Sequence, residues 1–199
     1  QGSDISVNDN TKRLKKKGIK FFLGHNKKNI KYAQAVVYSS AIKKNNPEIK
    51  EAYIKKIPVL SRADMLSELM KNKKSIAIAG SHGKTTTTSM LGHLLVCSGL
   101  SPTIITGGIM NNFGQNIYLT DSNYVVVEAD ESDGSFTHLN PDVAVLTNID
   151  DDHLVHYENN FENLLNSFIN FSENVPFYGY LIINGDDKNI KKIAGTFFF

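Results

Sequence analysis

The sequence of 199 residues is longer than a typical single domain and can bury a substantial core, so we expect one or two domains. With 41% hydrophobic, 21% charged and 10% aromatic residues, the composition excludes a disordered, collagen-like or disulfide-stapled chain. The single cysteine, Cys97, cannot form an internal disulfide, which fits a reducing compartment. Because no apolar run approaches the roughly 20 residues of a membrane span and residues 1–10 do not resemble a signal peptide, we expect a cytoplasmic protein without membrane insertion.

The formal net charge of +2 hides a division along the chain. Residues 1–74 hold 18 of the 22 basic and 6 of the 20 acidic residues, whereas residues 75–199 hold the other 4 basic and 14 acidic ones. This change predicts two units with different roles. The basic residues are mostly scattered lysines, which favours a solvated surface, so we expect no nucleic-acid partner.

The basic part alternates strands with helices, as is typical of a parallel α/β sheet. Three apolar runs predict buried strands: residues 19–24, 35–40 and 57–60. We expect a short helix at 25–34 and an amphipathic helix at 61–72 that Ser61 caps. The sequence therefore predicts a partial Rossmann-like domain over residues 1–73. No glycine-rich turn that grips a pyrophosphate precedes it, so we expect the chain to start within a domain.

A glycine loop follows the next predicted strand, at 75–80, and leads into a helix that Gly99 ends. The loop reads G-S-H-G-K-T-T, so the full spacing G-x-x-x-x-G-K-[ST] is not met. The strand before it and the helix after it favour nucleotide binding. The alternative is a glycine turn in an unrelated α/β protein, which gives no reason for the four threonines that follow Lys84.

Each residue type of the loop suits phosphate chemistry. Gly80 and Gly83 let backbone N–H groups point at phosphate oxygens, and the helix N-terminus adds positive potential. Lys84 can reach the β- and γ-phosphates, and the Thr85 hydroxyl can bind Mg²⁺.

Two further apolar runs predict strands that end in acidic residues: 124–130 and 142–148. Open parallel sheets bind ligands at the carboxyl ends of their strands, so Glu128 could meet the Mg²⁺ held by Thr85. His153 could supply a second metal contact. In the alternative, Asp150 to Asp152 form a solvated helix cap and His153 is an ordinary surface or core residue. The crowding of like charges favours a bound cation.

The elements from residue 74 onward predict a second domain. The strands alternate with helices, and FENLLNSFINFSENV at 161–175 has the apolar spacing of a core-facing helix. We therefore expect a phosphate-loop-type central ATPase domain with a mostly parallel sheet over residues 74–199.

Four motifs resemble the Mur ligase family. They are G-S-H-G-K-T-T at 80–86, E-A-D-E-S-D-G-S-F at 128–136, H-L-N-P-D-V-A-V-L-T-N-I at 138–149 and D-H-L at 152–154. Earlier segments resemble the family as well: GSD at 2–4, SSAI at 39–42, IPVLSRADMLSELM at 57–70 and GG at 107–108. The likeness covers essentially the whole chain in collinear order, so it is far more specific than the loop alone.

The resemblance implies an ATP-dependent amide ligase of peptidoglycan synthesis. In this family ATP phosphorylates a carboxylate and an amine attacks the acyl phosphate. A carboxylate is a poor electrophile, and phosphate supplies a leaving group while Mg²⁺ and Lys84 neutralise the developing charge. The motifs imply UDP-N-acetylmuramate and L-alanine as substrates, with ATP and Mg²⁺ as cofactors.

The resemblance also implies roles for single residues. The nucleotide would be held by Gly80, Ser81, His82, Gly83, Lys84, Thr85, Thr86 and Asn148. One Mg²⁺ would be bound by Thr85 and Glu128, and a second would be bound by His153. Catalysis would use Lys84 and His153. The UDP-sugar would be contacted by Ser39, Ser40, His82 and Asn112.

The chain departs from the family pattern at a few places. Ser81 stands where the family usually has Thr, and V-H-Y at 155–157 lacks an Asp that is common there, so the resemblance gives less support to the expected position of His153. The family has three domains, so we expect this chain to lack the opening turn of the first and the whole amino-acid-binding third, and not to ligate alone.

Three alternatives remain open. They are a non-catalytic nucleotide-binding remnant, the related ligase that recycles murein peptide, and a generic phosphate-loop phosphotransferase. E-S-D at 131–133, where the recycling ligase has E-Y-D, argues against the second. A generic phosphate-loop phosphotransferase would not explain the GSD and SSAI segments. The oligomeric state is not predicted.

Overall fold

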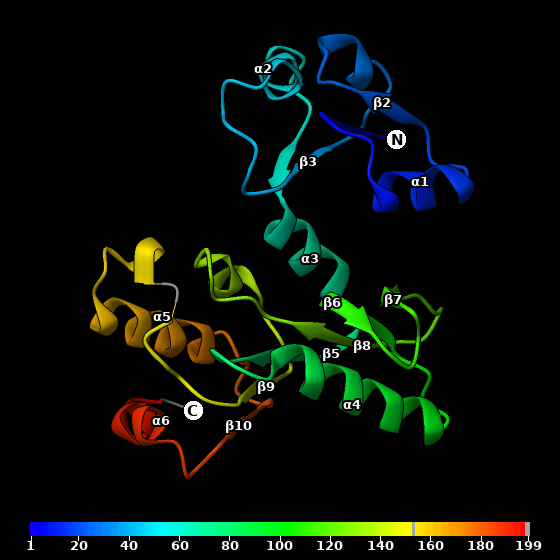
Figure 1. The fold of residues 1–199 in the computed structure, drawn as a ribbon. Helices are drawn as coiled ribbons and strands as arrows, with labels where there is room; N and C mark the ends of the chain where they lie inside the picture. Colours follow the sequence, from blue (N-terminus) through cyan, green and yellow to red (C-terminus); the bar gives the residue numbers. More distant parts are fainter. Residues whose placement is uncertain (153, 198–199) are drawn as a thin grey trace. The chain divides into compact units, whose positions relative to one another are not determined.

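The computed structural model describes residues 1–152 and 154–197, and the chain forms two compact units (Figure 1). The first unit is Gln1–Met65 and the second is Leu66–Phe199. The division falls inside helix α3 (Arg62–Met70), eight residues before the expected boundary at 73/74. Within the described ranges, no helix combines the length and apolar character that crossing a bilayer requires.

The first unit consists of two parallel strand pairs and short helices. Strand β1 (Gly2–Asp4) pairs with β2 (Phe21–Leu23), and β3 (Val36–Tyr38) pairs with β4 (Val59–Ser61). Its helical elements are α1 (Asp9–Lys16), the 3-10 turn η1 (Lys27–Ile30) and α2 (Pro47–Ile54). The helix expected at 25–34 is only the short turn η1, whose start is capped by the Asn26 side chain, which accepts a hydrogen bond from the Lys28 N–H.

The cap expected at Ser61 is confirmed. The Asp64 N–H donates to Ser61 Oγ over 3.0 Å, and the Ser61 N–H donates to Asp64 Oδ2 over 3.1 Å. This reciprocal pair satisfies two backbone donors at the start of α3.

The second unit contains a six-stranded sheet in the order β10-β9-β5-β8-β6-β7. Its strands are β5 (Lys74–Ala79), β6 (Thr103–Met110), β7 (Gln115–Tyr118), β8 (Tyr124–Glu128), β9 (Val143–Leu146) and β10 (Tyr180–Ile183). All neighbours pair in parallel except β6 and β7, which are antiparallel. The expectation of an α/β fold with a mostly parallel sheet is confirmed. Because β5 lies in the interior, the segments that follow β5, β8 and β9 emerge side by side at one edge.

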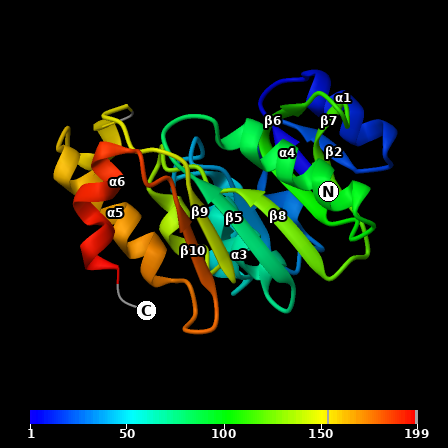
Figure 2. The ribbon, with the colours of Figure 1, turned by 90° about the horizontal axis from the view of Figure 1, so that it is seen from below.

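Helices cover both faces of this sheet. They are α4 (Lys84–Cys97), α5 (Phe161–Glu173) and α6 (Lys188–Ile193). Three 3-10 turns complete the unit: η2 (Ser135–His138) after β8, η3 (Leu154–Tyr157) after β9 and η4 (Ala194–Thr196) after α6. Figure 2 shows α4 beside β8 and β6, and α5 and α6 toward the β10 side. A Cβ on Gly92 of α4 would lie 2.5 Å from Ile104 Cδ1, so this helix approaches β6 closely only because it has a glycine there.

Three phenylalanine rings form the centre of the core on the other face. Phe136 packs against Phe168 and Phe171 with ring centroids 5.1 and 5.2 Å apart, and all three side chains are buried. Ala77 and Ala79 of β5 belong to the same cluster. The helix expected at 161–175 is thus confirmed as a core-facing element.

Replacing Phe168 by alanine should lower the free energy of unfolding by about 3–5 kcal/mol, because it removes a fully buried ring and leaves a cavity. Phe177→Ala is the matched control, since that ring is 92% exposed and its loss should change the value by less than about 0.5 kcal/mol. Urea denaturation followed by circular dichroism measures both. Equal effects of the two substitutions would contradict the assignment of this core.

Candidate functional site

The glycine loop leaves the end of β5 against the residues that follow β9. Gly80 has φ +138°, and a Cβ there would lie 2.1 Å from Thr147 Oγ1 and 2.9 Å from the Asn148 carbonyl oxygen. No side chain fits in that space, and the backbone conformation itself favours glycine. Gly83, with φ +79°, precedes the first turn of α4 and carries no side chain over it. No side chain caps the start of α4, so its first N–H groups are left without a side-chain partner. These N–H groups give this end of the helix a partial positive charge.

Hydrogen bonds tie this loop to the segment after β9. The Ser81 N–H donates to the Asn148 carbonyl over 3.0 Å, and the Asp150 N–H donates to Ser81 Oγ over 2.8 Å. The His82 N–H donates to Asn148 Oδ1 over 2.8 Å, while Asn148 Nδ2 donates to the His82 carbonyl over 2.9 Å. The Asn148 amide thus clamps the loop backbone. The hydroxyl of Ser81 is thus part of this network.

The ring of His82 points toward the acidic segment that follows Asn148. Its Nε2 lies 3.3 Å from Asp152 Oδ2 and 3.7 Å from Asp150 Oδ2, and all three side chains are more than half exposed. The side chains of Asp150 and Asp152 are therefore accessible to solvent. His153, which follows them, lies outside the described residues.

Lys84 is folded back against the loop. Its Nζ lies 2.7 Å from the Gly80 carbonyl, 3.2 Å from the Ser81 carbonyl and 2.8 Å from Glu131 Oε2. The Lys84 side chain is 11% exposed and the Glu131 side chain only 1%. The pair is therefore a nearly buried ion pair directly below the loop.

Glu131 is a site residue that the sequence reasoning missed. Burial raises the pKa of its carboxyl above the usual value and the nearby Asp130 adds to the rise, while the Lys84 ammonium opposes it. In the described part of the chain, Glu131 Oε1 has no hydrogen-bond partner. Burial also raises the pKa of the Tyr157 hydroxyl, which donates to the Glu131 carbonyl oxygen. In the sequence Glu131 is one carboxylate in an acidic run, and nothing there separates it from Asp130.

Thr85 and Glu128 meet at the edge of the sheet, as expected. The Thr85 hydroxyl lies 2.8 and 3.0 Å from the two carboxylate oxygens of Glu128, and the Gly107 N–H donates to the same carboxylate over 2.8 Å. A Cβ on Gly107 would lie 3.2 Å from Glu128 Oε1, and one on Gly108 would lie 3.3 Å from Thr85 Cγ2. The two glycines of β6 therefore leave room for this contact.

The donor set at this point fits Mg²⁺. A threonine hydroxyl and a carboxylate are hard oxygen ligands, and Mg²⁺ is usually held by one or two protein oxygens together with water and phosphate. Within residues 1–152 and 154–197, no group of three His, Cys, Asp or Glu side chains could enclose a metal ion. The fit therefore rests on Thr85 and Glu128.

A cavity of about 370 Å³ adjoins the loop between α4 and the segment after β6. Thr85, Thr86 and Asn112 line it together with the apolar side chains of Met90 and Leu94. Two residues expected at the nucleotide and one expected at the sugar thus share one cavity.

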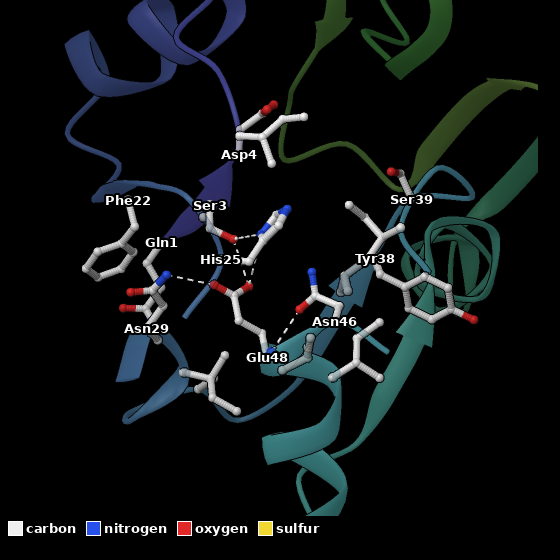
Figure 3. Close-up of a pocket in the computed structure, with 18 of the residues that line it drawn as sticks. Gln1, Ser3, Asp4, Phe22, His25, Asn29, Tyr38, Ser39, Asn46 and Glu48 are labelled. Atoms are coloured by element: carbon white, nitrogen blue, oxygen red, sulfur yellow. Dashed lines mark hydrogen bonds and ion pairs between the residues drawn. The ribbon is translucent and has the colours of Figure 1, made fainter. Parts of the chain in front are cut away.

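The first unit has a separate pocket of about 500 Å³, at the ends of its strands (Figure 3). Ser3 Oγ donates to Glu48 Oε2 over 2.7 Å and lies 2.9 Å from His25 Nδ1. Ser39 lines the same pocket, whereas Ser40 is not among its lining residues. The polar cluster of Ser3, His25 and Glu48 was not anticipated from the sequence, since its members are up to 45 residues apart.

A parallel sheet with a glycine loop, a lysine and a threonine at the start of the following helix defines an α/β domain of the phosphate-loop class. Residues 1–74 match the Mur ligase family, catalytic domain, and residues 78–197 match the Mur ligase middle domain. The chain belongs to the Mur ligase family.

Named relatives agree with this assignment. The UDP-N-acetylmuramate--L-alanine ligase of Rickettsia typhi is 54% identical over 194 residues, which are 98% of this chain and 39% of that protein. The ligase of the same name from Rickettsia prowazekii is 53% identical over the same length. This chain therefore spans about two fifths of the length of these relatives.

Solved structures share the fold. The UDP-N-acetylmuramate-alanine ligase of Thermotoga maritima matches with a TM-score of 0.81 and 31% identity, covering 96% of this chain and 44% of that one. The UDP-N-acetylmuramate:L-alanyl-gamma-D-glutamyl-meso-diaminopimelate ligase of Neisseria meningitides matches with a TM-score of 0.85 and 27% identity, covering 98% and 66%.

Gly80→Ala should lower the free energy of unfolding by about 2 kcal/mol or more, because the new Cβ collides with Thr147 and the backbone there disfavours a side chain. Gly185→Ala is the control, since a Cβ at Gly185 meets nothing within 4 Å, and it should change stability by less than about 0.5 kcal/mol. Thermal unfolding measures both variants. A Gly80→Ala chain as stable as the control would show that the loop does not hold this close approach.

Proposed function

We propose that this chain is the ATP-binding and UDP-sugar-binding part of a ligase that joins L-alanine to UDP-N-acetylmuramate. In this reaction a carboxylate oxygen of the lactoyl group attacks the γ-phosphorus of ATP, and ADP leaves. The amine of L-alanine then attacks the carbonyl carbon of the acyl phosphate, and inorganic phosphate leaves as the amide bond forms and the amine loses a proton.

One observation supports the nucleotide role above all others. The Thr85 hydroxyl lies 2.8 Å from the Glu128 carboxylate, immediately after a glycine loop whose lysine is nearly buried beneath it. A bare glycine-lysine-threonine sequence occurs often by chance. The carboxylate that would share a cation with the threonine belongs to a different strand, so its presence there is an independent observation.

The residues of the loop have separate tasks in this proposal. The N–H groups at the start of α4 bind phosphate oxygens, and Asn148 keeps the loop backbone in place for them. Lys84 neutralises the negative charge that develops on the transferred phosphoryl group. Mg²⁺ held by Thr85 and Glu128 supplies further charge neutralisation and orients the phosphates. His153 is proposed to bind a second Mg²⁺.

The first unit supplies the proposed UDP-sugar site. Its pocket is lined by Ser39, which the family resemblance connects with the sugar nucleotide, and holds the polar side chains of Ser3, His25 and Glu48. The exposed, free Cys97 is compatible with a reducing environment, and we propose a cytoplasmic location.

The names of the relatives suggest two different amine substrates. The Rickettsia relatives are named for L-alanine, and the Neisseria protein is named for a tripeptide. This chain is 54% identical to the Rickettsia typhi protein and 27% identical to the Neisseria protein, which supports L-alanine as the amine substrate.

A chimera tests the proposal by placing this chain within a complete ligase. This chain would replace the matching 194 residues of the Rickettsia typhi ligase, with the rest of that enzyme kept. We expect phosphate release that requires ATP, UDP-N-acetylmuramate and L-alanine together. Lys84→Met should reduce the rate by about 100-fold or more, because it removes the cation that faces the phosphoryl group.

A Lys71→Met chimera is the matched control, since the Lys71 ammonium pairs with Glu68 on an exposed surface and its loss should leave the rate unchanged. A chimera that folds and binds UDP-N-acetylmuramate but releases no phosphate would support the non-catalytic remnant instead.

A further inference from the structure

We propose that Glu131 is a positioning residue that competes with the nucleotide phosphates for the Lys84 ammonium. The inference rests on the proposed nucleotide role of the loop and adds a residue to it. In this account Lys84 has a resting position on Glu131, and nucleotide binding draws it away toward the phosphates.

The contacts of Lys84 define the resting position. An ammonium has three N–H donors, and three oxygens surround Nζ: the carbonyls of Gly80 and Ser81 and one oxygen of Glu131. The ammonium is therefore surrounded by protein oxygens, two from the loop and one from Glu131. To reach a phosphate, Lys84 must exchange at least one of these partners.

Glu131 is held in place and does not follow the lysine. Its carbonyl oxygen accepts hydrogen bonds from the Gly134 N–H and from the Tyr157 hydroxyl, which fixes the backbone on both sides of the turn. Its side chain is 1% exposed. Among the described residues, Lys84 is the only cation within ion-pair distance of this carboxylate.

The loss of Lys84 costs its carboxylate partner more free energy than its carbonyl partners. A carbonyl released by Lys84 can be solvated or can accept another donor. A buried carboxylate that loses its only counter-ion is left with an uncompensated charge, which is strongly unfavourable. Nucleotide binding must therefore overcome the attraction of Glu131, and the carboxylate lowers nucleotide affinity.

The substitution Glu131→Gln tests this directly, because glutamine keeps the shape and removes the charge. We expect the variant to bind ADP about tenfold more tightly or better than the unaltered chain, as measured by isothermal titration calorimetry without divalent metal. Glu173→Gln, at an exposed position near the end of α5, is the control for the change in net charge and should leave the affinity unchanged. If the glutamine variant does not fold, Glu131→Asp withdraws the carboxylate from Nζ and should shift affinity in the same direction.

The same substitution in a Lys84→Met chain shows whether Glu131→Gln changes ADP affinity through Lys84. In a Lys84→Met chain, adding Glu131→Gln should leave ADP affinity unchanged, because the group for which carboxylate and phosphate compete is absent. Weaker or unchanged ADP binding by Glu131→Gln alone, or an equal gain in both backgrounds, would overturn the inference.

A nucleotide-free measurement separates this inference from the proposed function. Acetylation of Lys84 by trace acetic anhydride, read by mass spectrometry, should be faster in Glu131→Gln than in the unaltered chain, because the amine is freed from its pair. An unaltered chain that fails to bind ADP contradicts the proposed function, while the acetylation rates still decide the inference. Equal rates would overturn it.

Discussion

The parallel pairing of β5 between β8 and β9 is the constraint on which the site depends. In this register Ile78 lies opposite Glu128 on one side, and Ala79 lies opposite Leu146 on the other. The residues that leave β5 therefore emerge between the end of β8, which carries Glu128, and the segment after β9, which carries Asn148. A shift of one residue would turn each side chain to the other face of the sheet and separate these groups.

The loop obtains its shape from what surrounds it more than from its own residues. Gly80 lies so close to Thr147 that only glycine fits, and the Asn148 amide bonds to both sides of the His82 peptide backbone. The open end of α4 and the buried pair of Lys84 and Glu131 follow from this arrangement. The Lys84 ammonium is thus paired with the Glu131 carboxylate beside the loop, where a phosphate group can compete for it.

The sequence was most informative where one strong signal determined the local structure. Long apolar runs predicted β5, β8 and β9, and the loop between β5 and α4 was recognised with Lys84 and Thr85 in place. The structure also brings Glu128 to Thr85, which was expected from the way parallel strands end at one edge. The helix α2 was missed, although Asn46 and Pro47 form an ordinary helix start, because its apolar spacing is weak.

Other features depend on contacts that no local pattern reveals. Strand β6 was missed because Gly107 and Gly108 resemble a loop, yet they are glycines since Glu128 and Thr85 approach them closely. The acidic run from Glu128 to Asp133 was interpreted as a sign of a metal. Its most buried member, Glu131, instead pairs with the Lys84 ammonium, and burial of that kind is decided by the tertiary fold.

Thr85 and Glu128 are proposed to hold the cation that accompanies a nucleotide on this loop. The most direct test compares the affinity of the chain for ATP with Mg²⁺ and with a chelator, for the unaltered chain and for Glu128→Gln. We expect Mg²⁺ to strengthen ATP binding by about tenfold or more in the unaltered chain, and we expect this gain to be largely lost in Glu128→Gln. An equal gain from Mg²⁺ in both chains, or no ATP binding by either, would contradict this proposal.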